Sequence, residues 1–453
     1  MQTYLLGDDS IGHQILRALR DAAQRGVRVR LLVDDLYTAG TTDLLLGLAA
    51  HPGIELRIYN PFPHGRDSTW LRLSNLLGGF DRLNRRMHNK LLIADGRAAI
   101  VGGRNLADAY FMRDAGANFL DFDLLCVGAV APELAGHFDA FWNSRFAVPL
   151  AALASSPLDA GQRRASFDRL TSTPAQAAPL GTESTGSARA RPLPQSPLPA
   201  GIRAALQALA DLPLVVADAQ VFFDSPEKTA GIQRQGKRLP VAELLDQAHE
   251  RVMIVSPYFL PSSAGLARMR SAQARGVSVQ VITNSLLDSD EPLVSLAYGQ
   301  RRQALPAIGV RLFEVSSERL RLQDTMRRAL GDSVGRLHAK LGFIDDRVLL
   351  VGSMNLDPRS ATTNTELALA IDSPALVRLV LGSSSRPTGT PALTCAWQTT
   401  ARRCAGCRGM RKAPKRPVTS PHRPGGSACG CGCCPAWCPT ICCDGLSPAV
   451  AMM

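Results

Sequence analysis

The pattern of apolar and polar residues in the first part of the chain is repeated in the second part. Early in the chain, Ile15, Leu16, Leu19 and Ala22 are spaced for one apolar face of a helix, which we expect over residues 11–25. Short apolar runs typical of buried strands lie between the expected helices. The predicted order continues as strand 28–33, helix 44–49, strand 54–59, a hairpin within 88–105, strand 121–127 and helix 132–144.

The second part of the chain repeats this order. It predicts strand 252–259, a helix, strand 278–283, a helix, strand 309–315, a hairpin within 338–355 and strand 366–371. Strands that alternate with helices favour a mainly parallel sheet covered on both faces. The predicted fold class is therefore α/β, with two repeated units that pack about a pseudo-twofold axis. Each unit is expected to hold a mixed, largely parallel sheet flanked by helices.

The two hairpins carry the clearest sign of a duplication. Residues 88–105 read HNKLLIADGRAAIVGGRN, and residues 338–355 read HAKLGFIDDRVLLVGSMN. Five positions match at a constant offset of 250 residues: His88 with His338, Lys90 with Lys340, Asp95 with Asp345, Gly102 with Gly352 and Asn105 with Asn355. The same offset aligns residues 15–36 with 265–286. A whole unit is duplicated, with a period far too long for a solenoid.

This duplication predicts four segments. Residues 1–150 form the first unit, and 151–211 form a linker rich in Ala, Ser, Pro, Thr and Gly. Residues 212–381 form the second unit, which opens with a strand in LPLVVADAQVFF, and 382–453 form a tail. The second unit has a helix at 239–250 before its first full strand, whereas the first unit begins almost at the matching strand. We therefore expect the N-terminus to be truncated.

The tail has a different composition from the rest of the chain. Ten of the 11 cysteines lie between Cys395 and Cys443, and no periodic pattern accompanies them. One interpretation is a zinc site made from the pairs Cys404-x-x-Cys407 and Cys431-x-x-Cys434. The favoured interpretation is a shifted reading frame near residue 381, which leaves a disordered or arbitrary sequence. The remaining cysteine, Cys126, matches the usage of a reduced cytoplasmic protein.

The net charge and the hydropathy of the chain limit the kinds of partner, such as nucleic acid or a membrane, that we expect. The net charge is +12, but the tail holds nine basic residues against the single acid Asp444, so the preceding part carries only about +4. Such a mild excess does not by itself indicate nucleic acid. No apolar run reaches the roughly 18–20 residues of a spanning helix, and MQTYLLGDDS lacks the basic start of a signal peptide. We expect a protein that is soluble or peripheral to a membrane.

The repeated His-x-Lys pairs indicate chemistry on a phosphate diester. Residues two apart in a strand point to the same side, so each pair faces one way and the two pairs can meet across one cleft. Lysines and amides can hold the non-bridging oxygens while one neutral imidazole attacks phosphorus and the other, protonated, serves the leaving alkoxide. The candidate residues are His88, Lys90, Asn105, His338, Lys340 and Asn355.

A nucleophilic histidine needs an acceptor on its far ring nitrogen, which fixes the tautomer. Glu366 is the expected partner of His338, because it lies at the start of the strand after Asn355. Asp121 or Asp123 is the expected partner of His88.

The two aspartates of the repeated pattern have a different predicted role. Asp95 and Asp345 fall where the hairpins turn, so we expect them to be structural. We do not expect a metal at the repeated motif, because lysine is a poor metal ligand and each half supplies one histidine there.

The sequence His-x-Lys-x4-Asp followed by GGRN or GSMN, twice in one chain, resembles the phospholipase D superfamily. Over roughly 2–150 and 210–381, the chain is most similar to the bacterial cardiolipin synthase branch, and especially to its C-type class. The stretches SPYFLP (256–261) and TNSLLDSDEPLV (283–294) fit the same branch.

The resemblance implies two repeated phospholipase D-like units and a phosphatidyltransferase that joins two phospholipids without a metal or cofactor. It also implies a covalent phosphatidyl-histidine intermediate, with His88 as nucleophile and His338 as acid and base, and a substrate-binding role for Tyr258. The implied lipids are phosphatidylglycerol and, as a second candidate, phosphatidylethanolamine. The implied location is peripheral, on the cytoplasmic face of the bacterial inner membrane.

Several alternatives stay open. The apolar and basic segment WLRLSNLLGGF (70–80) fits either a membrane-dipping loop or a cap on the active-site domain. A nuclease or plain phosphodiesterase is the alternative enzyme, although the folded part lacks a strong basic stripe. An inactive, truncated gene product is the second alternative, and the unusual chain ends favour it.

Overall fold

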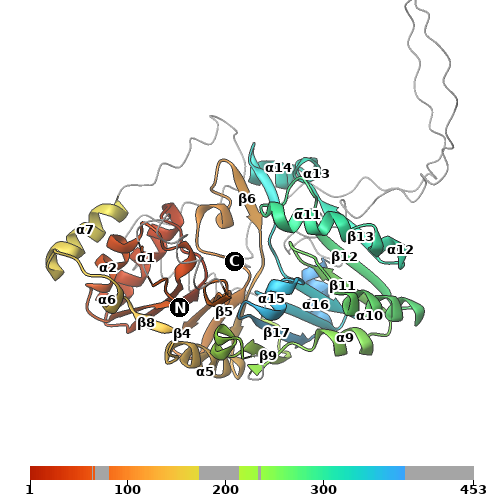
Figure 1. The fold of residues 1–453 in the computed structure, drawn as a ribbon, viewed down its shortest axis with the longest axis horizontal. Coiled ribbons are helices and arrows are strands. Elements are labelled where there is room, and N and C mark those ends of the chain that lie inside the picture. Colours follow the sequence, from red (N-terminus) through yellow and green to blue (C-terminus); the bar gives the residue numbers. More distant parts are fainter. Residues whose placement is uncertain (64, 67–80, 173–213, 233–235, 383–453) are drawn as a thin grey trace, which may run out of the picture.

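The computed structural model describes residues 1–63, 65–66, 81–172, 214–232 and 236–382. Two α/β halves lie side by side, the first coloured red to yellow and the second green to blue (Figure 1). The predicted apolar loop 70–80, most of the predicted linker and the predicted tail lie outside the described residues. This includes both cysteine pairs of the zinc interpretation.

The first half is built on a seven-stranded sheet with the order β7-β5-β4-β1-β2-β3-β8. Along the chain its strands are β1 (Gln2–Thr3), β2 (Val29–Asp34), β3 (Ile54–Tyr59), β4 (Leu91–Ala94), β5 (Ala98–Gly102), β7 (Asp123–Val127) and β8 (Ala147–Pro149). The helices of this half are α1 (Ser10–Gln24), η1 (Asp35–Tyr37), α2 (Thr42–Ala49), η2 (Asp108–Phe111), α5 (Val130–Trp142), α6 (Leu150–Leu153) and α7 (Ala160–Ser172).

The second half repeats the plan in an eight-stranded sheet with the order β10-β9-β17-β16-β15-β11-β12-β13. Its strands are β9 (Asp218–Asp224), β10 (Gly236–Lys237), β11 (Arg251–Val255), β12 (Ser278–Asn284), β13 (Arg311–Val315), β15 (Leu341–Ile344), β16 (Val348–Gly352) and β17 (Leu367–Asp372). Its helices are η3 (Pro226–Ala230), α9 (Val241–Gln247), α10 (Ser263–Ala274), α11 (Pro292–Arg301), α12 (Ala304–Ala307), α13 (Ser317–Leu320), α14 (Asp324–Leu330), α15 (Pro358–Thr362) and α16 (Pro374–Leu381).

Matching local signals start and stop the equivalent helices α1 and α10. Asp9 caps α1 by accepting a hydrogen bond from the Gly12 backbone N–H at 2.9 Å, and Ser262 caps α10 in the same way from Gly265 at 3.1 Å. Both helices end just before a glycine, Gly26 or Gly276, at φ 91°. This left-handed conformation is cheap only for glycine and ends the helix.

The predicted α/β class and the two repeated units are confirmed, but the sheets are not largely parallel. Among the described strands, only the β1–β2 and β2–β3 pairs of the first sheet and the β11–β12 and β12–β13 pairs of the second are parallel. The hairpins β4–β5 and β15–β16, and the strands that extend them, pair antiparallel. A hairpin reverses the chain within a few residues, so its strands cannot run parallel.

Part of the predicted linker is folded. Helix α7 packs against α2, with Phe167 fully buried between them. A side chain on Gly47 would clash there, because its Cβ would lie 2.8 Å from the Phe167 Cβ. The composition of α7 resembles that of a linker, and a single aromatic residue, Phe167, makes most of its apolar contact. The helix was therefore not predicted.

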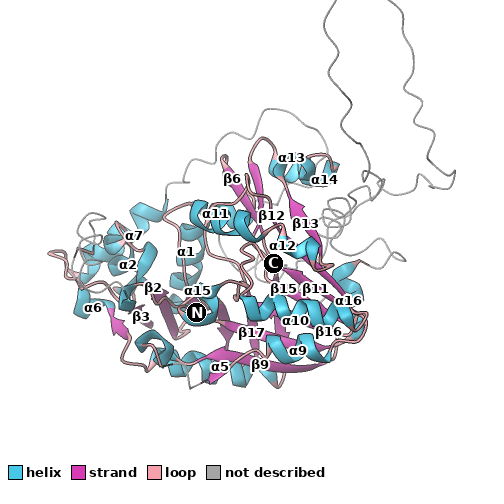
Figure 2. Cartoon of the chain, turned by 45° about the vertical axis from the view of Figure 1, so that its right-hand side comes forward, coloured by secondary structure: helices cyan, strands magenta, loops and turns pink. Residues whose placement is uncertain are grey.

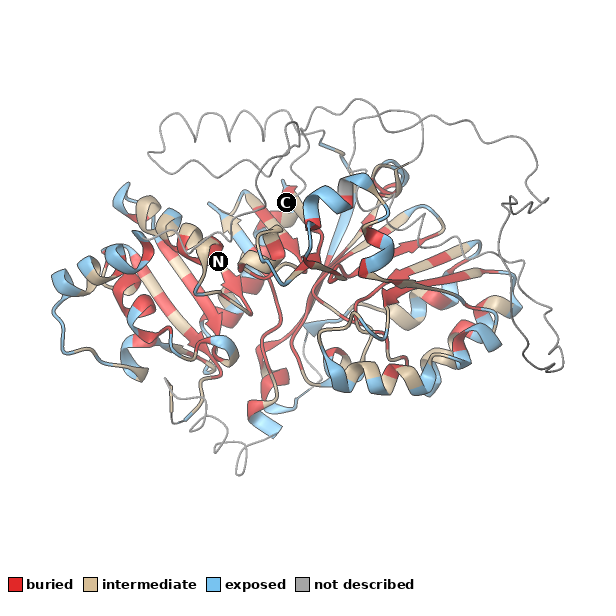
Figure 3. Ribbon diagram, turned by 90° about the horizontal axis from the view of Figure 1, so that it is seen from above, coloured by how far each residue is buried: buried red, intermediate tan, exposed pale blue. Residues whose placement is uncertain are grey.

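One hydrophobic core crosses the boundary between the halves. Phe141 and Leu134 of α5 belong to the same buried cluster as Val221 of β9 and Leu349 of β16. A separate two-stranded ribbon, β6 (Ala117–Leu120) with β14 (Val334–Leu337), also joins the halves in parallel pairing, and both views show β6 extending toward the second half (Figure 2). Buried residues follow both sheets and the ribbon, while the outer helices are exposed on one side (Figure 3). The halves therefore form one body.

Candidate active site

Each His-x-Lys segment is held by the opposite half of the chain. The backbone N–H of His88 donates to the Thr365 carbonyl at 3.0 Å, and that of His338 donates to the Leu120 carbonyl at 2.7 Å. Thr365 directly precedes Glu366, and Leu120 directly precedes Asp121. The two contacts are equivalent, so each unit holds the backbone of the other unit's histidine in the same way.

This exchange determines which carboxylate orients which imidazole. His88 Nδ1 lies 3.0 Å from Glu366 Oε2, and His338 Nδ1 lies 2.6 Å from Asp121 Oδ2. The predicted pairing of Glu366 with His338, and of Asp121 or Asp123 with His88, is therefore wrong. It assumed that each histidine finds its acceptor within its own unit, whereas the carboxylates cross to the other unit.

Asp123 has a different neighbour. It accepts hydrogen bonds from the Arg104 side chain and from the Arg104 backbone N–H, the latter at 3.3 Å. Burial raises the pKa of Asp123 to about 6 despite the Arg104 charge. Asp123 thus fixes the turn that carries Asn105 and is not in hydrogen-bond contact with a histidine.

Both imidazoles are neutral near pH 7. Burial, followed for His338 by the Lys340 charge, lowers the pKa of each histidine to about 4, although Glu366 and Asp121 act in the opposite direction. Burial also opposes ionisation of Glu366 and Asp121, but the adjacent histidines and lysines outweigh it and lower both carboxyl pKa values. The site thus pairs neutral rings with ionised carboxylates, so each Nδ1–H donates to its carboxylate and each Nε2 faces away from that carboxylate with its lone pair available.

The two lysines lie inside the same site. Lys90 Nζ donates to the His88 carbonyl at 2.7 Å, and Lys340 Nζ lies 3.1 Å from His338 Nε2. Burial lowers the pKa of Lys340 to about 8 and that of Lys90 well below its usual range, with the Lys340 charge as a further cause. Burial of two lysines in one site favours an anionic ligand there.

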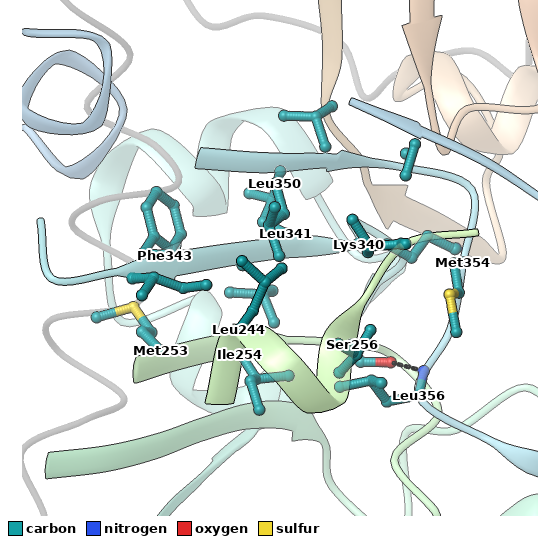
Figure 4. A pocket seen from close by; sticks show the side chains of 18 of the residues that line it. Leu244, Met253, Ile254, Ser256, Lys340, Leu341, Phe343, Leu350, Met354 and Leu356 are labelled. Carbon is teal, nitrogen blue, oxygen red and sulfur yellow. Dashed lines mark hydrogen bonds between the residues drawn. The ribbon is translucent and has the colours of Figure 1, made fainter. Parts of the chain in front are cut away.

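Apolar side chains account for part of this desolvation. Lys340 lies at one end of a pocket between α9 and the second sheet, with Met354, Leu356 and Ile254 among its walls (Figure 4). The Ser256 hydroxyl closes that end by accepting from the Leu356 backbone N–H at 3.1 Å. Dry walls strengthen the interaction of Lys340 with any anion in the site.

The predicted asparagines also indicate a position where a ligand binds. Asn105 and Asn355 follow β5 and β16, and their side chains are 2% and 5% exposed. The Oδ1 atom of each is buried without a hydrogen-bond partner, and so is Oε1 of Glu366. Buried polar atoms rarely remain unpaired, so their concentration here marks a place where a ligand completes the network.

The turn after each hairpin differs between the halves. Ser353 donates its hydroxyl hydrogen to Glu366 Oε2, which is the oxygen that faces His88. At the equivalent position Gly103, a Cβ would lie 2.5 Å from Asp121 Oδ1 and 3.1 Å from Lys340 Cδ. Glu366 is thus held by a hydroxyl, while Asp121 and Lys340 need the space that a glycine leaves.

Asp34 and Asn284 hold the backbone of the residues that precede the two histidines, and the sequence did not mark them as candidates. Asp34 accepts from the Met87 backbone N–H at 2.8 Å and from Arg86, and both Asp34 and Arg86 are fully buried. Asn284 accepts from the Leu337 backbone N–H at 2.8 Å. The 250-residue offset aligns Asp34 with Asn284, so the alignment contained the signal.

Aromatic rings close the sides of the site. Tyr4 meets His88 edge-on at 4.9 Å between ring centroids, and Tyr110 meets His338 in the same way at 5.0 Å. The predicted substrate-binding residue Tyr258 donates its hydroxyl hydrogen to Asp290 at 2.8 Å. Tyr4 and Tyr110 have no counterpart in the repeated pattern, which is why the sequence did not reveal them.

The hairpin aspartates occupy turns, as predicted. Asp95 and Asp345 have φ values of 53° and 49°, and Asp95 is exposed. Asp345 accepts from three consecutive backbone N–H groups, those of His249, Glu250 and Arg251, at 2.7–2.9 Å. Asp345 therefore anchors the start of β11, away from the histidines.

Comparison with known proteins gives consistent matches across both halves. A family model described as "Cardiolipin synthase, PLD-like domain" matches residues 1–142 and 241–382. Cardiolipin synthase C of Escherichia coli (strain K12) is 35% identical over 385 residues, which is 84% of this chain and 77% of that protein. Cardiolipin synthase B of Salmonella typhi is 27% identical over 372 residues, or 82% and 70% of the two chains.

A solved structure shares the fold. The crystal structure of phosphatidylserine synthase from Haemophilus influenzae Rd KW20 superposes with a TM-score of 0.54 at 15% identity. The match covers 88% of this chain and 80% of that chain. The arrangement of two joined α/β halves is therefore shared well beyond the similarity in sequence.

Proposed function

Because this chain belongs to the phospholipase D-like family of cardiolipin synthases, we propose that it forms cardiolipin by moving a phosphatidyl group between two phospholipids. The relatives identify the chain as a phospholipid phosphatidyltransferase. One observation carries the proposal: two neutral imidazoles, each oriented by a carboxylate from the opposite half, share a buried site with two lysines.

In the first proposed step, His88 Nε2 attacks the phosphorus of a donor phospholipid. A phosphorus–nitrogen bond forms and the bond from phosphorus to the head-group oxygen breaks. His338 gives a proton to that oxygen, so a neutral alcohol leaves. Glu366 accepts the Nδ1 hydrogen of His88 and stabilises the positive charge that develops on the ring. Lys90 and Lys340 stabilise the charge on the phosphoryl oxygens.

In the second proposed step, the primary hydroxyl of phosphatidylglycerol takes the place of the departed alcohol. His338 Nε2 removes its proton, the alkoxide oxygen bonds to phosphorus, and the phosphorus–nitrogen bond breaks. His88 is restored and His338 again holds a proton for the next cycle. With phosphatidylglycerol as donor and acceptor, the balanced products are cardiolipin and glycerol.

Protonation of His338 depends on the substrate in this proposal. Burial and the Lys340 charge keep its pKa at about 4 without a ligand. An anionic phosphodiester counters the lysine charges and accepts hydrogen bonds from Lys340, which raises the pKa of His338. In this proposal the acid therefore forms as the donor lipid binds.

Peripheral contact with a bilayer is part of the proposal, since both substrates reside there. No helix in the described part of the chain is long and apolar enough to cross a membrane. Leu287, Leu293 and Leu296 are 94%, 80% and 65% exposed, and they flank Asp290 in the loop before α11 and in α11 itself. We propose that these three leucines, which include Leu293 and Leu296 (the α11 leucines), enter the bilayer interface.

The direct test is an incubation of the full chain with phosphatidylglycerol vesicles, with and without phosphatidylethanolamine. Cardiolipin identified by mass spectrometry supports the proposal, and its loss in His88→Asn ties it to the site. Phosphatidic acid as the sole lipid product would indicate a hydrolase, because water has then replaced the lipid hydroxyl. Cleavage of DNA without any lipid product would indicate a nuclease.

A further inference from the structure

Tyr258 lies at the wall of the site, next to the backbone that carries His338. The Asn284 amide donates to the carbonyls of Leu337 and Pro257, at 2.9 and 3.5 Å, and these residues precede His338 and Tyr258. On its other side, Phe259 pairs with Leu356, the residue after Asn355. The backbone of Tyr258 is thus fixed between the histidine and the asparagine of the second half.

Asp290 extends this wall and has an unused acceptor. Its Oδ2 accepts from the Tyr258 hydroxyl at 2.8 Å, while its Oδ1 is buried with no hydrogen-bond partner. A buried carboxylate oxygen without a partner costs free energy, so this position favours a ligand that donates a hydrogen bond. Asp290 is also near enough to act electrostatically on Lys340 and on Tyr110, whose ring contacts His338.

A carboxylate suits only one part of a phospholipid. It repels the phosphate, which the lysines hold, and it attracts a hydroxyl or ammonium group. The structure assigns Asp290, positioned by Tyr258, as a subsite for the hydrogen-bond-donating head group of the lipid. This inference rests on the proposed function and adds to it the recognition of the group that leaves or enters.

The duplication supports this assignment, because the first half lacks the subsite. The 250-residue offset places Gly40 opposite Asp290, between the aligned pairs Asp34 with Asn284 and Thr42 with Pro292. The bridges Leu6 with Leu106 and Phe259 with Leu356 place Leu5 opposite Tyr258. Neither glycine nor leucine can bind a head group by a side-chain hydrogen bond. These two positions of the first half therefore offer no matching subsite, which agrees with the acid and base role proposed for His338.

The test compares lipids with and without a head-group donor against a substrate that has no head group. The probes are short-chain phosphatidylglycerol, phosphatidylethanolamine and phosphatidylcholine, with bis(4-nitrophenyl) phosphate as a reporter of the phosphodiester centre. In Asp290→Leu we expect kcat/KM to fall about 10-fold or more for phosphatidylglycerol and phosphatidylethanolamine, the usual effect of losing a charged hydrogen bond. Hydrolysis of bis(4-nitrophenyl) phosphate should change less than about twofold. Phosphatidylcholine, whose cationic head group cannot donate a hydrogen bond, should lose less than phosphatidylethanolamine.

Two further variants separate charge from acceptor geometry. Asp290→Asn keeps an acceptor oxygen but removes the charge, so it should impair phosphatidylethanolamine more than phosphatidylglycerol. Tyr258→Phe leaves Asp290 unpositioned and should raise KM for both lipids while retaining the 4-nitrophenyl activity. Glu243→Gln, an exposed carboxylate in α9, is the matched control and should behave as wild type.

The outcomes distinguish this inference from the proposed function. Equal loss on every probe in Asp290→Leu, or no loss on any, overturns the inference. If the wild type releases glycerol from phosphatidylglycerol without forming cardiolipin, the proposed transfer alone is rejected. The head-group preference is then measured as the rate at which each head group is released. A wild type that releases neither glycerol nor ethanolamine overturns both.

Discussion

The ring of His88 lies 3.0 Å from the carboxylate of Glu366, which belongs to the opposite half of the chain. The mirrored contact joins His338 to Asp121 at 2.6 Å. Neither half therefore contains a complete site, although each contains a complete His-x-Lys-Asn set. The two histidines become usable only when β6 and β14 are paired and the segment around Thr365 meets His88. Catalytic competence is thus coupled to the packing of the two halves.

The two histidines should respond differently to a good leaving group. Nitrophenolate leaves without a proton, so His338→Asn should retain a burst of nitrophenol from bis(4-nitrophenyl) phosphate, while His88→Asn should lose it. With phosphatidylglycerol, both variants should lose activity by about 100-fold or more, since a general acid contributes about 10²–10⁴-fold. Stopped-flow absorbance measures the burst. A burst that survives in His88→Asn and disappears in His338→Asn would reverse the roles.

The turns after the hairpins should also respond unequally. Ser353→Ala removes the hydroxyl that donates to Glu366 and accepts from the Leu367 backbone N–H. It should lower kcat by about 10-fold and the free energy of unfolding by about 1–3 kcal/mol. Gly103→Ala should be more damaging, because its Cβ meets Asp121 Oδ1 at 2.5 Å and must displace the partner of His338. Steady-state kinetics and thermal unfolding measure the two effects. Similar kinetics for Gly103→Ala and wild type would contradict this steric account.

The sequence predicted the members of the candidate site better than the contacts between them. The histidines and lysines of both repeats lie in one site, and the 250-residue repeat had marked each of them as well as both asparagines. The carboxylates were paired the wrong way round, since a pattern in one dimension does not show which half contributes to which side. Tyr110 and Asp290 lie outside the repeated pattern and emerge only from contacts in space.

The positions of strands were predicted better than their directions, for similar reasons. Strands such as Ile54–Tyr59 have strong local apolar patterns, and they lie where the sequence placed them. Strand direction was misjudged because alternation of strands with helices is a local signal, whereas the pairing of β16 with β17 is not. Helix α7 was missed because its polar composition resembles a linker and only Phe167 anchors it.

The buried pair of Asp34 with Arg86 should matter for stability far more than an exposed pair. Removing one partner of a buried ion pair typically costs about 3–5 kcal/mol, so Asp34→Asn should lower the free energy of unfolding by about that amount. Glu55→Gln is the matched control, because its partner Arg28 is 70% exposed and such pairs contribute about 0–1 kcal/mol. Urea unfolding measures both. A cost for Asp34→Asn as small as that of the control would contradict the structural role.

Stability should fall as the pH drops from about 6.5 toward 4. Burial lowers the pKa of His88 and His338 to about 4 and that of His137 to about 3, whereas the unfolded chain titrates them near 6.5. Between these values the unfolded state binds protons that the folded state does not, so acid favours unfolding. The lowered pKa values of Glu366 and Asp121 act in the same direction at lower pH.

His137 allows this effect to be measured outside the proposed chemistry. Its Nε2 lies 3.2 Å from Asn89 Nδ2 and its ring contacts Phe141, so His137→Gln retains an acceptor there. Thermal unfolding followed from about pH 7 to pH 5 should show a shallower fall in Tm for this variant than for wild type. An unchanged slope would mean that His137 does not contribute to the pH dependence.

The α11 leucines should control binding to vesicles without affecting the chemistry. Each of Leu293 and Leu296 offers a largely exposed side chain close in sequence to Asp290, and burial of a leucine is favourable by about 1.5–3 kcal/mol. Leu293→Ser with Leu296→Ser should therefore weaken co-sedimentation with phosphatidylglycerol vesicles by about 10-fold or more, while activity on monomeric short-chain lipid stays near wild type. The matched control is Leu158→Ser with Leu170→Ser, exposed at 41% and 43% near and in α7, far from α11 (Figure 1). Equal vesicle binding by the two double variants would place the membrane contact on another face, because only the first pair adjoins Asp290.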